Sequence, residues 1–145
     1  MSLQNLLGVS LENVTPEKET VRRLLAAAVR HIADAKVRSI SAETRFSSAY
    51  TAIRMLADVG LHAQGYRTLT SKPGHHQTAI QALTKSLNVD SKIVILLDKL
   101  RKQRNLTEYS GDIIPESAVA ECLFQAESLY AVAVSWLKKH QPDLI

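Results

Sequence analysis

The chain has 145 residues, of which 46% are hydrophobic and 22% are charged, with only five glycines and four prolines. This length suits a single domain that buries about two-thirds of the surface of its unfolded chain, and the composition excludes a disordered or low-complexity protein. The formal net charge of +4 permits an anionic partner but is too small to identify a nucleic-acid-binding protein by itself.

The compartment follows from the cysteine count and from the absence of targeting signals. Cys122 is the only cysteine, which excludes an intrachain disulfide, and its position on an apolar helix face indicates a buried thiol rather than a nucleophile. The start of the chain lacks the features of a secretion signal, and no stretch has the roughly 18 continuous apolar residues of a membrane span. We therefore expect a cytoplasmic protein without membrane contact. Its single domain covers residues 1–145, with a loosely ordered segment over 1–14.

Two helices are predicted in the first half of the chain. Thr15 and Pro16 give a start signal, a capping hydroxyl followed by proline at the first helical position. Apolar residues then recur at helical spacing over residues 21–35. Ser41 is the capping candidate for the second helix, whose apolar stripe covers residues 46–61.

Three more helices are predicted in the second half. The loop over residues 65–76, GYRTLTSKPGHH, contains two glycines and one proline and precedes a short helix over residues 76–87. Asp90 or Ser91 caps the next helix, and Pro115 opens the last one. Five helices without a convincing strand predict an all-α antiparallel bundle.

An arginine continues the apolar stripe of the fourth helix. Ile93, Leu97 and Leu100 recur at steps of four and three residues, which predicts one inward face, and Arg104 follows four residues later on that face. Because a guanidinium stays charged in a protein, an inward arginine needs an internal acceptor or an anionic ligand. The alternatives are therefore a ligand site and an ion pair with a carboxylate such as Asp98.

The adjoining face of the same helix carries further polar groups. Arg101, Asn105 and Tyr109 follow each other at four-residue intervals. A cation, an amide and a phenol beside Arg104 predict a phosphate site. Arg45 flanks the bundle face on the second helix. It is a further candidate ligand-binding residue, or a salt-bridge former if it acts alone.

The adjacent His75 and His76 favour an anion over a metal. Neighbouring helical residues point about 100° apart, whereas a two-histidine metal site on a helix needs a spacing of four residues, so no metal is expected. Near a helix start, neutral histidines can bond an anion, and with Lys72 and Gly74 they would form a small cradle. The alternative is a capping histidine with no ligand.

Three segments, SAETRFSSAYTAI, GYRTLTSKPGHHQTAIQAL and LRKQRNLTEYSGD, followed by a long last helix, resemble the HEPN superfamily of small helical bundles over residues 21–138. The resemblance centres on Arg104 and Asn105, because in nuclease branches an Arg-Asn pair begins a motif that ends in His. It implies a homodimer in which two copies of the motif face each other. It also implies either an RNA-cleaving toxin with a nucleotidyltransferase antitoxin partner, or a protein that binds RNA or nucleotides without cutting.

The chain departs from the nuclease motif at Tyr109, which stands where the motif has its histidine. Metal-free RNA cleavage needs a base for the 2′-hydroxyl proton and a cation for the charged phosphorane. Arg104 fits the second role, but a phenol with a pKa of about 10 is roughly 0.1% ionised near pH 7 and is a poor base. The catalytic candidates are therefore Arg104, Tyr109 and, if the fold brings them close, His75 and His76.

We predict a HEPN-like domain that binds RNA or nucleotide phosphates at an Arg-Asn-Tyr groove without efficient cleavage and without a cofactor. Two alternatives stay open: a metal-independent endoribonuclease toxin of a toxin–antitoxin pair, and a non-catalytic dimerisation bundle. The candidate ligand-binding residues are Arg45, Lys72, Arg101, Arg104, Asn105 and Tyr109.

Overall fold

The computed structural model describes residues 2–145, and these are mostly helical, which confirms the all-α prediction. The long helices are α1 (Lys18–Ala35), α2 (Ala42–Ala63), α5 (Ser91–Ser110) and α6 (Glu116–His140). The short helix predicted over residues 76–87 is divided into α3 (His75–Gln81) and α4 (Leu83–Ser86). Single turns of 3₁₀-helix, η1 (Leu3–Leu6) and η2 (Pro142–Leu144), lie near the two ends.

A small antiparallel ribbon joins the N-terminal segment to the loop after α2. Strand β1 (Leu11–Asn13) pairs with β2 (Tyr66–Thr68), with Leu11 opposite Thr68. The expectation of no strand is wrong here, because strands of three residues are too short to show an alternating pattern. The sequence also predicts a loosely ordered segment over 1–14, yet Leu11 is fully buried in the core.

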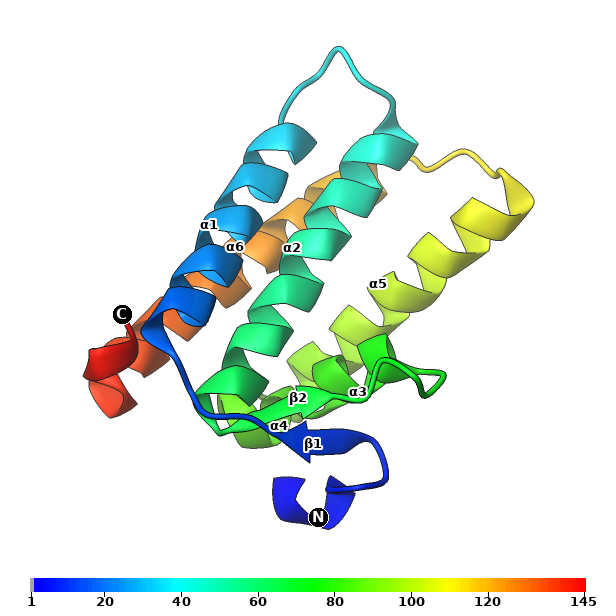
Figure 1. Cartoon of the computed structure of the whole chain (residues 1–145). Helices are drawn as coiled ribbons and strands as arrows, with labels where there is room; N and C mark the ends of the chain where they lie inside the picture. The colour runs from blue at the N-terminus through cyan, green and yellow to red at the C-terminus, as the bar shows by residue number, and fades with distance from the viewer. Residues whose placement is uncertain (1) are drawn as a thin grey trace.

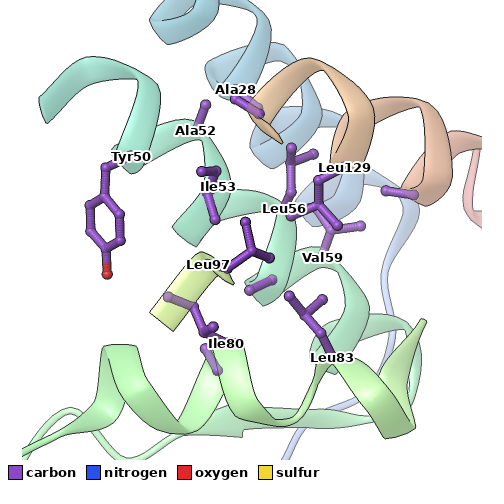
Figure 2. Close-up of a cluster of buried hydrophobic side chains, with 14 of the residues drawn as sticks. Ala28, Tyr50, Ala52, Ile53, Leu56, Val59, Ile80, Leu83, Leu97 and Leu129 are labelled. Atoms are coloured by element: carbon purple, nitrogen blue, oxygen red, sulfur yellow. The ribbon is translucent and has the colours of Figure 1, made fainter. Parts of the chain in front are cut away.

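Helix α2 is the centre of the molecule. It lies between α1 and α5, with α6 behind it, so it is covered on several sides (Figure 1). Figure 2 shows side chains of α1, α2 and α6, among them Ala28, Leu56 and Leu129, meeting in one cluster. Leu97 of α5 and Leu83 of α4 close the same cluster from the other side.

Helix α5 is attached mainly to α2, α3 and α4 and has few contacts with α6. Its second half leans away from the bundle (Figure 1). Val94, Leu97 and Leu100 are buried, whereas Ile93 is 37% exposed. The predicted inward stripe is therefore correct for Leu97 and Leu100 but wrong for Ile93, because Val94 takes the inward position one residue later.

Two of the predicted helix starts are confirmed by capping bonds. Ser41 Oγ accepts from the Thr44 N–H at 3.2 Å, and Asp90 Oδ1 accepts from the Lys92 N–H at 2.8 Å. Helix α1 starts at Lys18, later than Thr15 and Pro16 suggest. The N–H of the capping residue Glu17 donates instead to His62 Nε2 of α2 at 2.9 Å, a long-range contact that local sequence does not reveal.

Candidate functional site

Arg104 lies at the inner edge of α5, one turn beyond the buried Leu100, and its side chain is 24% exposed. One terminal nitrogen donates to Asn105 Oδ1 at 3.4 Å, and the other lies 3.2 Å from Glu108 Oε1. Nε is buried and has no hydrogen-bond partner among residues 2–145. The side chain of Glu108 is 52% exposed on the next turn of the same helix. The guanidinium is therefore only partly satisfied, and its acidic partner is open to solvent.

Tyr50 of α2 provides the surface on which Arg104 rests. The guanidinium carbon lies 5.6 Å from the centre of the tyrosine ring, within range of a cation–π interaction. Tyr50 is 1% exposed, and its hydroxyl has no hydrogen-bond partner within the described part of the chain. Figure 2 shows this hydroxyl directed toward α3. Burial raises the pKa of Tyr50 to about 12, so the hydroxyl stays protonated and is available as a donor.

The two histidines at the start of α3 lie in the same region. Their ring centres are 4.4 Å apart, and the ring of His76 lies 6.5 Å from that of Tyr50. Burial, together with the neighbouring Arg54, His75 and Arg104, lowers the pKa of His76 to about 4, so this imidazole is neutral near pH 7. The fold thus brings His76 and the inward arginine to the same tyrosine ring, although the two are far apart in sequence.

Two further arginines complete this region, and each pairs with a carboxylate on its own helix. Arg101 Nε donates to Asp98 Oδ1 at 2.8 Å, and Arg54 Nη1 lies 3.8 Å from Asp58 Oδ2. Asp98, one possible partner for Arg104, thus pairs with Arg101 instead. Burial raises the pKa of Asp58 to about 6. We call the region the arginine corner, and it consists of Tyr50, Arg54, His76, Arg101 and Arg104.

A trough of about 550 Å³ adjoins the arginine corner, and Arg104 lines it. Ser47, Ser48 and Thr51 of α2 contribute hydroxyls to the trough. The remaining lining comes from the first turns of α2, from the end of α1, and from the end of α5 with the residues that follow it. His31 of α1 is held in place there, because its Nδ1 lies 3.3 Å from Ser48 Oγ, which donates to the His31 carbonyl at 2.9 Å. The carboxylates that line the trough are Asp34, Glu43, Glu108 and Asp112.

The other predicted ligand-binding residues lie outside the arginine corner. Arg45 is 4% exposed, pairs with Glu116 of α6 and donates to the Ile40 carbonyl at 3.3 Å, which matches the salt-bridge alternative. Lys72 is exposed in the loop before α3. Tyr109 is 92% exposed near the end of α5 and does not line the trough. Asn105 is half-buried and bonds Arg104.

Sequence reasoning missed several residues of this region. Tyr50 lies on the predicted apolar stripe over residues 46–61 and is buried as that stripe implies, but its contact with Arg104 is not predicted, and neither Arg54 nor Asp58 is singled out. The available signal is their spacing, because the three follow each other at four-residue steps and therefore share one face of α2. The hydroxyls of the trough give no comparable signal, since serines and threonines on an exposed helix face are common.

Comparison of the chain with protein-family models, with curated proteins and with solved structures gave no match. The likeness to the HEPN superfamily therefore rests on the motif residues alone and stays a prediction. Within residues 2–145, no group of three or more His, Cys, Asp or Glu side chains is arranged to hold a metal ion. No helix in this part of the chain combines the length and apolar character needed to cross a membrane.

Proposed function

We propose that this protein binds the phosphate of a nucleotide or RNA at the arginine corner, in the cytoplasm and without efficient cleavage. The observation that carries the proposal is a pair of buried donors without acceptors, Tyr50 Oη and Arg104 Nε. A buried polar group without a partner costs about 1–3 kcal/mol. An anionic oxygen in the arginine corner would accept from both groups and remove this cost.

The charges around these donors support the same ligand. Arg54, Arg101 and Arg104 converge on Tyr50 from two helices, and all three act on the pKa of its hydroxyl. The ion pair between Arg104 and the half-exposed Glu108 resembles surface pairs, which contribute only about 0–1 kcal/mol. A phosphate can therefore displace Glu108, because its hydrogen bonds to a guanidinium are charge-assisted and can be bidentate.

The histidines explain why binding is favoured over chemistry. The neutral His76 has a nitrogen that can accept a proton, but its pKa of about 4 makes it a weak base near pH 7. General bases are most effective when their pKa lies near the working pH. Tyr109 offers no substitute, since its side chain is 92% exposed and lies outside the trough.

A metal-independent endoribonuclease is the second candidate, and the observation that favours it is that His76 and Arg104 both lie near the ring of Tyr50. In that reaction His76 would take the proton of the RNA 2′-hydroxyl while Arg104 stabilises the phosphorane. We expect at most slow cleavage, for the reason given above. Incubation of concentrated protein with single-stranded RNA between about pH 6 and 9 checks this. Cleavage that His76→Ala abolishes would establish the second candidate in place of the first.

The binding test compares wild type with Arg104→Ala and a matched control, Arg22→Ala, which removes an exposed arginine paired only with Glu19. At low salt we expect wild type and the control to bind nucleotide and short RNA with equal affinity. Arg104→Ala should bind at least about tenfold more weakly, because hydrogen bonds to charged groups contribute about 1.5–3 kcal/mol. Added salt should weaken the remaining affinity. Equal affinity of Arg104→Ala and wild type, or no binding by wild type, would contradict the proposal.

The homodimer and the nucleotidyltransferase partner remain proposals that rest on the HEPN likeness. One feature supports a partner face: Leu106 and Tyr109 near the end of α5, and Ile113 in the segment that follows, are 62%, 92% and 84% exposed. Exposed apolar groups of this size in one region are typical of contact surfaces. A non-catalytic dimerisation bundle would use this same face, with Arg104 and Asn105 satisfied across the interface and no affinity for phosphate.

A further inference from the structure

The trough and the arginine corner have opposite charge, although they share Arg104. Four carboxylates line the trough, those of Asp34, Glu43, Glu108 and Asp112, and Arg104 is the only arginine or lysine among its lining residues. Like charges facing each other across a contact are strongly unfavourable. A chain of phosphates laid along the trough would therefore be repelled, whereas a neutral group rich in hydroxyls and amines would not.

The lining of the trough fits the sugar and base of a nucleotide. Carboxylates accept hydrogen bonds from sugar hydroxyls and from the amino groups of bases, and an acidic residue performs this role for ribose in dinucleotide-binding folds. Ser47, Ser48 and Thr51 can both donate and accept. The imidazole of His31, held by Ser48, provides a flat surface of the kind on which bases stack. The volume of about 550 Å³ is typical of a pocket for a small organic ligand.

Arg104 connects the two parts, since it lines the trough and also stacks on Tyr50. A phosphate bound to its free Nε and to the unpartnered hydroxyl of Tyr50, which is 1% exposed, would leave the rest of the ligand facing the trough. The unpartnered hydroxyl of Tyr50 is an observation independent of the acidic lining. It is directed toward α3, within the arginine corner, so it supports the phosphate end of the ligand.

We propose that the trough holds the sugar and base of a single ribonucleoside monophosphate whose phosphate lies in the arginine corner. The inference rests on the proposed function and narrows it. The ligand carries one phosphate and one nucleoside, and polyphosphates and RNA strands bind less well because their additional phosphates meet the carboxylates of the trough.

Calorimetric titration of wild type with a graded series of ligands tests the inference. The series consists of inorganic phosphate, ribose 5-phosphate, the four ribonucleoside 5′-monophosphates, the matching 2′-deoxy compounds, ATP and a short single-stranded RNA. We expect at least one ribonucleoside monophosphate to bind about tenfold or more tightly than inorganic phosphate, with ribose 5-phosphate between them. The 2′-deoxy form of this monophosphate, ATP and the RNA should all bind more weakly than the ribonucleoside monophosphate itself.

The variant Asp34→Asn tests the trough independently of the arginine corner. Asp34 is exposed, and removal of its charge leaves the arginine corner intact. Asp143→Asn, an exposed carboxylate in η2, is the matched control. Asp34→Asn should weaken the monophosphate about fivefold or more and leave inorganic phosphate unchanged or slightly tighter, since a negative charge is removed. The control should change neither affinity.

The outcomes distinguish this inference from the proposed function. If phosphate and the monophosphates bind equally and Asp34→Asn changes nothing, the nucleoside site in the trough is overturned while the phosphate site stands. Tighter binding of ATP or RNA than of any monophosphate overturns it as well. If no ligand of the series binds wild type, both the proposed function and this inference fail.

Discussion

At the scale of single residues, Tyr50 shows a conflict between stability and function. A tyrosine that is 1% exposed and has no hydrogen-bond partner costs free energy in the unliganded protein, and phenylalanine would fill the same space without this cost. Functional sites commonly retain groups of this kind, because the group that destabilises the free protein is the one that bonds the ligand.

Tyr50→Phe should therefore raise the free energy of unfolding by about 1 kcal/mol, because a buried unpaired hydroxyl is removed at almost constant shape. The same change should weaken nucleotide binding severalfold, since one donor to the phosphate is lost. Chemical denaturation and calorimetric titration measure the two effects. Tyr130→Phe, at a half-buried tyrosine of α6, is the control and should leave nucleotide affinity unchanged. A variant that is less stable but binds as well as wild type would show that the hydroxyl has a structural role.

At the scale of elements, the sequence predicts what local spacing determines. The helices that contain Ser41 and Asp90 have both an apolar stripe and a capping side chain, and both starts are correct. The start of α1 is missed because the N–H of its capping residue, Glu17, donates to a side chain of another helix, His62. The strands are missed because their pairing joins distant segments of three residues each.

The candidate site is likewise predictable from the sequence only where local spacing determines it. Arg104 is recognisable from its place on a local stripe, and the structure places it at the inner edge of α5. Its contact with Tyr50 and the approach of His76 depend on how α2, α3 and α5 pack, which spacing along one helix cannot reveal. The trough is still less predictable, because its lining comes from three helices, α1, α2 and α5, that are far apart in sequence.

The contact between α2 and α4 depends on the absence of a side chain at Gly60. A Cβ atom there would lie 2.6 Å from Ser86 Oγ and 2.8 Å from Leu87 Cγ, and both neighbours are buried. Gly60→Ala should lower the free energy of unfolding by about 1–3 kcal/mol, because overpacking outweighs the gain of about 1 kcal/mol in helix propensity. Thermal or chemical unfolding measures the change. Ser135→Ala, on the exposed face of α6, is the control for an alanine introduced into a helix. Gly8→Ala is unsuitable as a control, because the positive φ of Gly8 would strain an alanine. A Gly60→Ala protein as stable as wild type would mean that α4 can move away from α2 at little cost.

At the scale of the whole molecule, the bundle is asymmetric, and the asymmetry creates the proposed site. Helices α1, α2 and α6 pack closely, while α5 rests on one side of α2 through its first half and on α3 and α4 (Figure 1). The polar residues of α2 that face α5 would be costly in a closed bundle, because most of them would lose contact with both water and a partner. The open arrangement keeps Ser47, Ser48 and Thr51 at the trough and leaves three arginines close together.

This arrangement makes the stability of the whole protein depend on pH. The folded state lowers the pKa of His62, through burial, and of His76, to about 4, from an ordinary value of 6.5. As the pH falls below about 6.5, these histidines take up protons in the unfolded chain before they do so in the folded one, so unfolding becomes easier. Asp58 acts in the opposite sense. Its pKa is raised to about 6 from 3.8, so the folded state takes up this proton first and gains stability as the pH falls through 6 toward 3.8.

Between about pH 7 and pH 5, the free energy of unfolding should therefore fall less for His76→Gln than for wild type. The variant lacks an imidazole that takes up a proton more readily in the unfolded chain than in the folded one. For Asp58→Asn it should fall more over the same interval, since the compensating proton uptake of the folded state is absent. Urea denaturation at several pH values measures both slopes, with His140→Gln at an exposed histidine of α6 as the control. Parallel curves for wild type and His76→Gln would show that this imidazole is freely solvated. The arginine corner would then be open to water in the free protein, and Tyr50 and Arg104 would have water as their partner.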